Sequence, residues 1–583
     1  AALMAALSIT VSLAAPAFAE TYYYIDDGDI TITKDENGQT VKQGNKEAEN
    51  IGADEEIIIT THKEATTTLE SDLEGPAAED TGFGPVVEEN YQQEDAEESE
   101  DDDQKKSTEE SEDDDQKNAE ESENDEAQKD ADQPENTDRQ ENAGQQPQPQ
   151  QAAPADAAPA APAPANGFCK NIITVINNAA TALKLTLKDV KIDVSDTGKN
   201  TGYPWTSDEG KAALSVQGNG NVEIELDGNN ELKSGPHRAG LEKNTSTSTG
   251  TLTLKDDNNE AGSLTATGGD WGAGIGNGGY YGNSDNRSGE NITITGGTVN
   301  ATGGWGGAGI GGGYYGSGKN ITIKGGTVTA TGGEEGAGIG GGYYYGGGYY
   351  GNGYYGNGEN IKITDGTVNA TGGWGGAGIG GGGGGGNGAG GNGKNITIIG
   401  GTVTAGGGYR GAGIGGGISG SGKNITITGG TVNADGGTNA AGIGGGATGS
   451  GSNVTVSGAA QVTAIAGKSN GYYGAGATIG NGGDFTGSEN VDGKEIQADI
   501  SRVTTGYIHH IIYDPALVSE DNPLGIVREW WEPERPQPNP EDPEDPEDPN
   551  APAEESNEVS LGTPILHVET LEGDPLPFNA QQQ

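Results

Sequence analysis

Residues 291–313 read NITITGGTVNATGGWGGAGIGGG, and this stretch decides the fold. Apolar residues alternate with small or polar ones in three short segments, N-I-T-I, G-T-V-N-A and G-A-G-I-G, which is the period of a β-strand. The residues expected to point inward are Ile292, Ile294, Val299, Ala301, Ala308 and Ile310. Only glycine remains for the outer side of the third segment, so we expect a bare glycine face there. Glycine also suits the tight corners between strands, where positive φ is needed.

The same pattern recurs along the chain. The motif Asn-(Ile/Val)-x-(Ile/Val) begins at Asn291, Asn320, Asn360, Asn395, Asn424 and Asn453, so the spacings are 29, 40, 35, 29 and 29 residues. A ladder of isoleucines accompanies it, at Ile275, Ile310, Ile339, Ile379, Ile414, Ile443 and Ile479. One unit cannot bury its own apolar faces, whereas stacked units share a continuous core. The repeats therefore predict an all-β, right-handed parallel β-helix of about 29 residues per coil.

Residues 291–313 also resemble the repeats of exported bacterial carbohydrate-binding-domain proteins, which are similar to pectate-lyase-like right-handed parallel β-helix proteins. The resemblance covers about 168–500 and extends in part to the strands expected within 21–61. It implies a β-helix fold and a polysaccharide or cell-wall glycan as the ligand. Because one fold can carry many functions, the site must be argued from the residues themselves.

Composition separates the folded part from its flanks. The 583 residues include 109 glycines but only 31% hydrophobic and 5% aromatic residues, which excludes a large conventional globular enzyme. Of the net charge of -57, residues 1–165 contribute 44 acids and 9 bases, residues 166–513 contribute 26 and 20, and residues 514–583 contribute 18 and 2. This acidity argues against nucleic acid as a partner. Acidic flanks around a nearly neutral middle are typical of a folded module between solvated spacers.

The expected organisation has six parts. These are a signal-peptide remnant (1–19), short β segments (20–66), a disordered acidic and Pro/Gln/Ala-rich linker (67–165), the parallel β-helix (166–500), a short C-terminal segment (501–534) and a Pro/Glu/Asp-rich linker and tail (535–583). The first part ends in a small-x-small cleavage pattern at Ala17-Phe18-Ala19. Export without a cysteine pair suggests the cell surface of a Gram-positive bacterium, since Cys169 is the single cysteine. Beyond the extreme N-terminus no apolar stretch has the length of a membrane span.

Candidate catalytic and metal-binding groups are sparse in the regular repeats. General acid/base catalysis needs ionisable groups within hydrogen-bond reach, but the aspartates between 262 and 483 fall at different places in the repeat. The less regular upstream coils offer the remaining carboxylates that could cluster, namely Asp189, Asp193, Asp208, Glu223 and Glu225. His509-His510 has no acid close to it in sequence. We therefore expect no catalysis, no metal and no cofactor.

Aromatic residues mark the candidate site. Trp271, Trp305, Trp374 and Tyr409 come just before the G-A-G-I-G segment of their repeats. Tyrosine pairs follow it at Tyr280-Tyr281, Tyr314-Tyr315 and Tyr344-Tyr345, and Tyr472-Tyr473 precedes the last such segment. Stacked coils would align these rings as two columns flanking the glycine face. Flat rings suit a sugar, which stacks on aromatic faces while polar side chains bond its hydroxyls.

The sequence thus predicts a secreted, non-enzymatic β-helix that binds polysaccharide through these aromatic residues. Covering the corners of the solenoid is the alternative role for the rings. Two other functions stay open: a structural or adhesive surface protein whose glycine face packs against another protein, and a polysaccharide lyase or hydrolase. An ice-binding solenoid would also expose threonine ladders, but the mixed Thr/Asn pattern argues against it.

Overall fold

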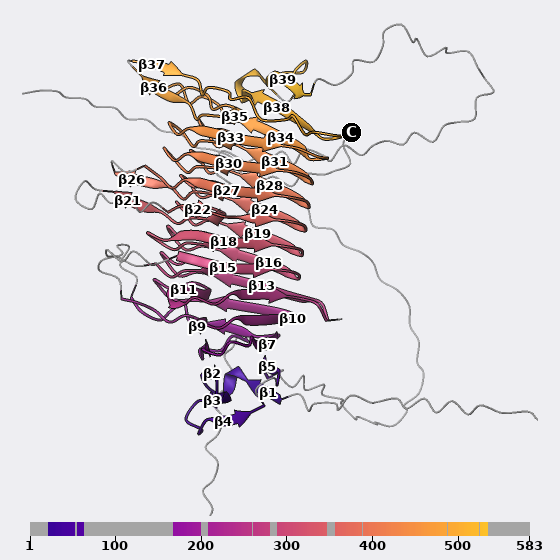
Figure 1. Ribbon diagram of the computed structural model, residues 1–583. Coiled ribbons are helices and arrows are strands. Elements are labelled where there is room, and N and C mark those ends of the chain that lie inside the picture. The colour runs from indigo at the N-terminus through magenta and orange to yellow at the C-terminus, as the bar shows by residue number, and fades with distance from the viewer. Residues whose placement is uncertain are drawn as a thin grey trace, which may run out of the picture. The chain divides into compact units, whose positions relative to one another are not determined.

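The computed structural model describes residues 21–52, 55–62, 167–199, 208–258, 260–279, 288–346, 356–386, 389–486, 488–523 and 525–533 (Figure 1). All of these residues belong to one compact unit. The expected signal segment and the two linkers lie outside the described residues. In the described part, the only helices are two single 3-10 turns, η1 (Ile25–Asp27) and η2 (Pro515–Leu517), and neither has the length to cross a membrane.

The chain winds into a parallel β-helix with three faces, each named here by its repeat segment. The NITI face contains β1 (Thr21–Tyr24), β5 (Ile57–Thr60), β7 (Leu183–Lys188), the first half of β10 (Val222–Lys233), β12 (Leu252–Lys255), β15 (Ser288–Ile294), β18 (Ser317–Ile323), β22 (Gly358–Glu359), β23 (Lys362–Ile363), β27 (Gly393–Ile398), β30 (Gly422–Ile427) and β33 (Gly451–Val456). The TVNA face contains β8 (Lys191–Asp193), the second half of β10, β13 (Gly262–Thr267), β16 (Thr298–Thr302), β19 (Thr327–Thr331), β24 (Thr367–Thr371), β28 (Thr402–Gly406), β31 (Thr431–Asp435), β34 (Gln461–Ala466), β38 (Tyr507–Tyr513) and β39 (Ile526–Glu532).

The AGIG face contains β2 (Ile30–Asp35), β3 (Gly38–Gln43), β4 (Glu49–Ile51), β6 (Ile173–Asn177), β9 (Leu214–Gly218), β11 (Leu241–Ser248), β14 (Ile275–Gly276), β17 (Ile310–Gly311), β20 (Ile339–Gly340), β25 (Ile379–Gly380), β29 (Ile414–Gly415), β32 (Ile443–Gly444) and β35 (Ile479–Gly480). Two short pairs stand outside the faces: β21 (Tyr344–Gly346) with β26 (Gly384–Gly386), and β36 (Asp484–Thr486) with β37 (Glu489–Val491).

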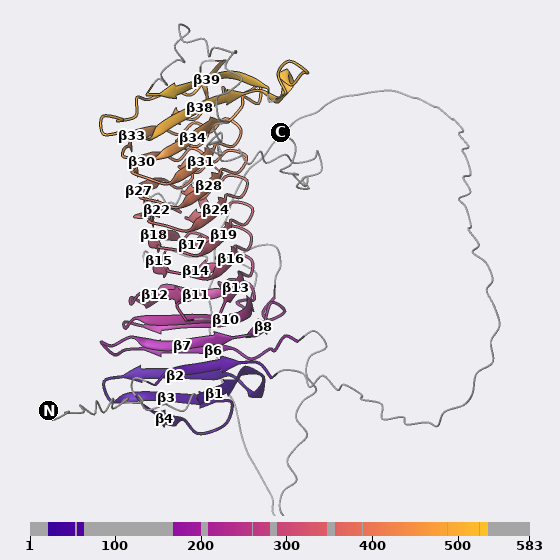
Figure 2. The same cartoon turned by 90° about the vertical axis from the view of Figure 1, so that its right-hand side faces the viewer.

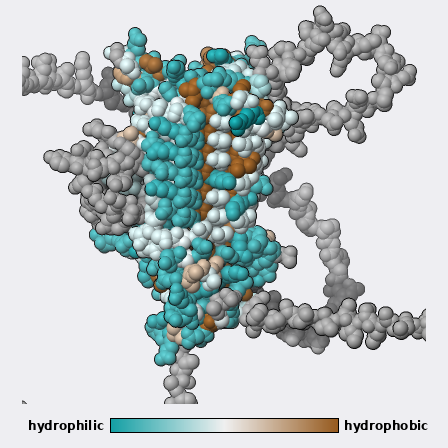
Figure 3. Space-filling model, viewed as in Figure 1, coloured by the Kyte–Doolittle hydropathy of each residue, from teal (hydrophilic) through white to brown (hydrophobic). Residues whose placement is uncertain are grey.

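Register confirms the predicted ladders. Ile310 pairs with Ile339, Ile339 with Ile379, and Ile379 with Ile414, so coils of different length stay aligned. The isoleucines of this ladder are fully buried. Because successive strands lie about 4.8 Å apart, each isoleucine packs on the ones above and below it. Figure 3 views the NITI and TVNA strands from outside, and there hydrophilic and hydrophobic residues form columns that run along the axis.

An asparagine ladder runs along the start of the NITI strands. The six motif asparagines all have positive φ, between 53° and 59°. From Asn320 onward each side-chain amide donates to the amide oxygen one coil earlier, for example Asn395 Nδ2 to Asn360 Oδ1 at 3.1 Å and Asn424 Nδ2 to Asn395 Oδ1 at 3.0 Å. The first, Asn291, donates to the backbone carbonyl of Thr249 at 3.1 Å. Asparagine tolerates the left-handed region better than most residues. Asparagine therefore suits these positions for two reasons: it adopts the positive φ, and its amide forms the hydrogen bonds between coils.

Strands from both ends of the described chain complete the solenoid. β5 pairs with β7 and β2 pairs with β6, although the partners are more than 100 residues apart in sequence (Figure 2). At the other end, β38 pairs with β34 in parallel, and β39 covers it in antiparallel orientation. These strands cover apolar coil ends, as the caps of a solenoid must.

The expected bare glycine face is wrong. The third strand of each regular coil has only two residues, and residues 306–314 are all buried. Ala308 N–H donates to the Gly312 carbonyl at 2.8 Å, which folds the chain back on itself. A Cβ on Gly307 would lie 1.9 Å from the Gly272 carbonyl oxygen of the preceding coil. Glycine is therefore required for close backbone approach between coils, and its outer side is covered.

Candidate functional site

The two loops that flank each AGIG strand fold together over it. In each coil, the fourth residue after the ladder isoleucine donates its backbone N–H to a carbonyl of the preceding coil. That carbonyl belongs to the fourth residue before the ladder isoleucine of the preceding coil. Examples are Tyr314 N to Trp271 O at 2.7 Å and Tyr343 N to Gly306 O at 2.7 Å. These bonds close the loops over β17 and its neighbours. The aromatic residues of both loops therefore share one surface, where two separate columns were expected.

One row of side chains along this surface is exposed. In four successive coils the exposed side chain belongs to the residue five positions before the ladder isoleucine. These residues, which we call the axial row, are Trp305, Glu334, Trp374 and Tyr409. Trp305 is 37% exposed, Trp374 is 45% exposed and Tyr409 is 40% exposed. The Trp374 and Tyr409 rings stack with centroids 5.4 Å apart and planes inclined by 23°. Three aromatic rings thus face solvent within about 15 Å along the axis, given the coil spacing.

Trp271 does not belong to the axial row. It lies only four residues before Ile275, so it aligns with Gly306, and Asp270 occupies the row position. The Trp271 side chain is 1% exposed and its ring lies 4.7 Å from that of His237. A ligand could not stack on it without moving the loops. Trp271 is therefore a buried residue that packs beneath the loops. The prediction that it shares an exposed position with Trp305 and Trp374 is wrong.

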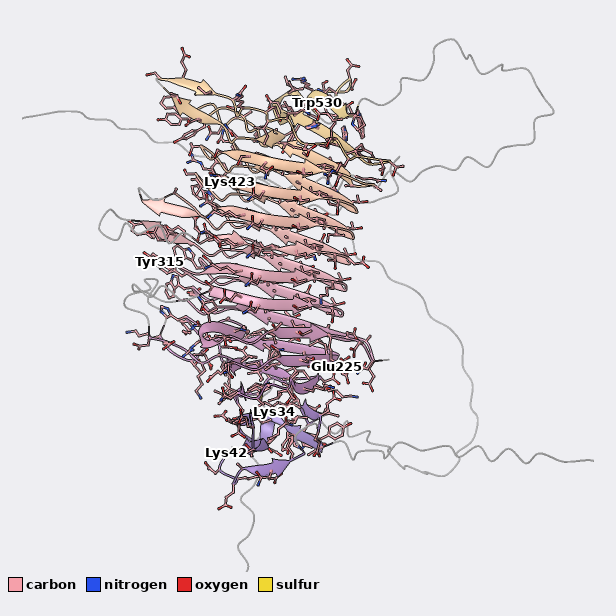
Figure 4. All side chains as sticks on the ribbon, in the orientation of Figure 1. Lys34, Lys42, Glu225, Tyr315, Lys423 and Trp530 are labelled. Atoms are coloured by element: carbon pink, nitrogen blue, oxygen red, sulfur yellow. The ribbon has the colours of Figure 1, made fainter. Side chains whose placement is uncertain are left out.

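The tyrosines after the AGIG strand divide in the same way. Tyr314 and Tyr344 are buried, at 3% and 8% exposure, whereas Tyr345 is 50% exposed. Tyr315 is half-buried at the edge of the solenoid and donates its hydroxyl to the Tyr345 carbonyl at 2.8 Å (Figure 4). Tyr280 and Tyr281 lie outside the described residues. The buried rings support the surface, and among the described members of these pairs Tyr345 is the most open to solvent.

Tyr343 joins the two loops. This tyrosine, which the sequence analysis missed, packs edge-on against Trp305 with centroids 5.3 Å apart and lies 5.5 Å from the Tyr314 ring. Aligning the chain on the ladder isoleucines would have revealed it, because Tyr343 follows Ile339 by the same four residues that separate Tyr314 from Ile310. Such packing of aromatic rings stabilises the loops that carry the exposed row.

Two glutamates make one end of the surface acidic. Trp305 Nε1 donates to Glu334 Oε2 at 2.5 Å, which holds the indole in place. Glu335 is half-buried beneath the next coil, where Gly375 and Gly383 leave room for its carboxyl. Burial, reinforced by the charge of Glu334, raises the pKa of Glu335 to about 7. This carboxyl therefore changes its charge near neutral pH.

An arginine marks the other end. The Arg410 guanidinium lies 4.8 Å from the Tyr473 ring centroid, 5.6 Å from that of Tyr409 and 5.8 Å from that of Trp374. Within the described ranges the guanidinium makes no hydrogen bond or ion pair, and its Nε atom is buried. Arg410 and Glu334 were not singled out from sequence, although both follow from counting back from the ladder isoleucines. The proximity of Tyr473 does not follow from any sequence pattern.

The upstream carboxylates do not form one group. Asp189 accepts from Asn229 N–H at 3.0 Å, Asp193 accepts from Ser195, and Asp208 pairs through its backbone with Lys199. Glu223 and Glu225 share the outer side of β10.

Glu225 is buried in a local network that lies between Tyr315 and Lys34 along the solenoid axis (Figure 4). Its carboxylate lies 3.0 Å from Lys255 Nζ and accepts from the backbone N–H groups of Asp257 and Asn258. These contacts anchor a surface turn.

The histidine pair acquires partners in the fold. β39 brings Glu529 to 3.2 Å from His509 Nε2, and His510 Nδ1 lies 2.6 Å from Thr478 Oγ1. Burial lowers the pKa of His510 to about 4. Across the part of the chain that the structure describes, no three His, Cys, Asp or Glu side chains are grouped as metal ligands.

Comparisons with known proteins bear on the repeats alone. The family model described as Beta helix repeat matches residues 292–314, 321–343, 396–418 and 425–447. No curated protein and no solved structure matches the chain. Each matched segment runs from a NITI strand through the TVNA strand to the loop after the AGIG strand, which is most of one coil. The matches and the strand register together identify the chain as a parallel β-helix protein.

Proposed function

We propose that this protein binds polysaccharide along the axial row, without catalysis, as a secreted protein of the bacterial cell surface. The observation that carries the proposal is the line of exposed rings formed by Trp305, Trp374 and Tyr409. Exposed tryptophans fixed by hydrogen bonds and ring packing are unusual unless they contact something. A pyranose ring covers such a face well, because it is apolar above and below and polar at its rim.

The geometry favours an extended ligand. The row follows the axis with one residue per coil, at about 4.8 Å per step. A chain of sugars lying along this row would meet an aromatic ring at three of four successive steps and the Glu334 carboxylate at the remaining one. Tyr345, on the neighbouring loop, adds a further exposed ring. Because the rings are already ordered by their packing, binding would lose little side-chain entropy.

The alternative functions are affected differently. A structural role through packing of an open glycine face against another protein loses its basis, because the AGIG strands are buried under their own loops. Adhesion of another protein to the axial row itself is one of the outcomes that the test below distinguishes. The lyase or hydrolase hypothesis would have to rest on the β10 carboxylates, where Glu225 is already bonded to Lys255 and to the following turn.

The test is a glycan screen of the full chain followed by calorimetric titration. Trp305→Ala with Trp374→Ala should weaken glycan binding by about 1–3 kcal/mol, or roughly 5- to 150-fold, as truncation of aromatic anchors does. The ladder isoleucines are untouched. As a control, Tyr22→Ala removes an aromatic ring of similar exposure from β1, at the other end of the described chain, and should leave binding unchanged.

Three results would redirect the proposal. Equal affinity of the double variant and the parent would place the site elsewhere. If no glycan bound but another surface protein did, adhesion would replace carbohydrate binding. Release of new reducing ends, or of products with an absorbing double bond, would revive the enzymatic hypothesis and direct mutagenesis to Glu223 and Glu225.

A further inference from the structure

Residues 21–62, which we call the N-terminal cap, lie far in sequence from the coils that they cover. β2 of the cap pairs in parallel with β6, and β5 of the cap pairs in parallel with β7 (Figure 2). The chain leaves the cap after β5 and reaches β6 only after residues 63–166, which are 104 residues. The cap nevertheless belongs to the same compact unit as the coils. It therefore completes the solenoid although its partner strands are distant along the chain.

The contact between the N-terminal cap and the first coils is apolar. The inward side chains of the cap lie in register with those of β6 and β7, and all of them are at most 1% exposed. The pairs are Ile30 with Ile173, Ile32 with Val175, Ile57 with Leu185, and Ile59 with Leu187. Without the cap, the four solenoid residues of these pairs would be open to water. The end of the solenoid formed by β6 and β7 therefore needs an occupant.

Polar contacts make this end of the solenoid specific for the N-terminal cap. Lys34 of the cap is 2% exposed, and its Nζ donates to the Ala182 carbonyl at 2.8 Å. The Ile172 backbone N–H donates to Asp29 Oδ1 of the cap at 2.9 Å. An unrelated strand would cover the apolar residues without making these bonds. The occupant that fits is thus residues 21–62, and every copy of the chain carries one.

The length of the connection limits the advantage of the cap that belongs to the same chain. The effective concentration of a tethered group falls roughly as the −3/2 power of linker length. A connection of 104 residues therefore supplies roughly 100-fold less than one of about five residues, the usual length in compact domains. Fully extended, 104 residues span about 350 Å, several times the length of the solenoid, which is about 50 Å. The cap can thus reach the end of a neighbouring solenoid as well as its own.

The order of synthesis favours the same exchange. The N-terminal cap precedes β6 and β7 in the chain, so it is made before its docking surface exists. At about 5–20 residues per second, the 104 residues of the connection take roughly 5–20 s to make. Pairing between segments so distant in sequence is also slow once both are present. Caps without a partner and solenoids without a cap therefore coexist wherever several copies fold close together.

We infer that the end of the solenoid formed by β6 and β7 docks the N-terminal cap of a second copy, and that cap exchange links copies of this protein. An exchanged cap makes the same contacts as a cap in its own chain, so the two arrangements differ only in effective concentration. That concentration is at most about millimolar for a flexible connection. Reciprocal exchange gives a closed dimer, and donation from each copy to the next gives an open row of solenoids. The inference does not depend on what the axial row binds.

Single cysteines on either side of the β5–β7 contact test the exchange in the full chain. Thr60 and Lys188 are paired in register on the outer side of these strands, so changing them leaves the core intact. Chains with Thr60→Cys are mixed with chains with Lys188→Cys, unfolded with a reductant, refolded together in high salt and only then oxidised. The salt screens the repulsion between the acidic chains, and the native Cys169 is buried after folding. At about 0.5 mM chain, roughly a tenth to a half of the chains should become disulfide-linked heterodimers, and at least tenfold fewer at about 5 μM.

Two controls calibrate the crosslink. A chain that carries both Thr60→Cys and Lys188→Cys should crosslink internally at low concentration, because its own cap is docked there and neighbouring strands are close enough for a disulfide. The matched control mixes chains with Thr322→Cys and chains with Lys362→Cys, since these residues pair in the same way on the NITI face between two consecutive coils. That mixture should form no more heterodimer than parent chains do, because neither strand belongs to the cap.

Three results would overturn cap exchange. A yield of heterodimer no higher than that of the matched control would show that each chain keeps its own cap. Equal yields at both concentrations would contradict a competition between the cap of the same chain and that of a second copy. Absence of the internal crosslink in the double variant would contradict the docking of the cap on β7 itself. A yield that exceeds the control and rises with concentration supports the exchange.

Discussion

Removing one amide from the asparagine ladder separates two contributions to the stability of the solenoid. Asn395 lies in the middle of the ladder, with φ at 54°, and its amide donates to Asn360 and accepts from Asn424. Asn395→Gly keeps the backbone conformation accessible and removes two hydrogen bonds. Asn395→Ala removes the same bonds and also forces a Cβ-bearing residue that lacks the amide into the left-handed region.

The expected costs follow from these terms. Two exposed hydrogen bonds contribute about 1–2 kcal/mol together, so Asn395→Gly should lower the free energy of local opening by that amount. The left-handed conformation adds about 1 kcal/mol, so Asn395→Ala should cost about 2–3 kcal/mol. Thr397→Ala, two residues further along β27 on its half-exposed outer side, should change stability by less than about 0.5 kcal/mol.

Hydrogen exchange of the full chain is the assay, because solenoid stability is set between neighbouring coils and a global midpoint would average the effect. The loss of protection should centre on residues 361–427 and fade within a coil or two on either side. Equal losses for the glycine and alanine variants would show that positive φ carries no cost here. Losses no larger than that of Thr397→Ala would refute the contribution of the ladder.

Three further perturbations test the core and two titrating groups. Ile379→Asp places an unpaired carboxylate in the fully buried ladder and should lower the free energy of unfolding by about 4 kcal/mol. Hydrogen exchange should increase first in residues 361–414. An unchanged exchange pattern would argue against the inward position of Ile379. Glu335→Gln should stabilise the fold by about 1–2 kcal/mol more at pH 8 than at pH 5. The reason is that the unfolded carboxyl ionises above its ordinary pKa of 4.5 while the folded one stays protonated up to about 7, so the cost of burying this carboxyl grows across that range. A gain independent of pH in denaturant melts would contradict this. Burial lowers the pKa of His510 to about 4, so between pH 7 and pH 5 the unfolded chain binds the proton first and the stability of the C-terminal cap should fall by about 2 kcal/mol. His510→Gln should flatten this pH dependence of stability. A slope that persists in the variant would assign the dependence to another group.

The repeat pattern was sufficient for the fold and for the inward side chains. Ile292, Val299 and Ile310 each recur at the same place in successive units, and each is buried as expected. A 29-residue period with alternation in every segment leaves few arrangements other than stacked coils, because a single coil exposes the apolar residues that its neighbours cover. The isoleucine ladder also stays in register across the 40-residue and 35-residue units, as the aligned repeats predict.

The candidate site was predicted less well. The sequence identified the loops around the AGIG strand and their aromatic residues, but it grouped Trp271 with Trp305 although the two differ by one position. In a tight loop that shift moves a ring from 37% exposed to 1% exposed. Counting from the ladder would have corrected this error and would have found Glu334 and Arg410.

Alternation by itself specifies which side chains enter the core, because period and chirality act on each residue locally. It does not specify what covers the outer side of a glycine strand, which depends on whether neighbouring backbones can approach. Only the tertiary structure decided that the loops close over the AGIG strands, since the bonds from Tyr314 to Trp271 and from Tyr343 to Gly306 join residues of successive coils. It likewise brought Tyr473 to Arg410 from a coil further along the chain. Those contacts arise from loop geometry and from hydrogen bonds between coils, neither of which leaves a periodic signal in the sequence.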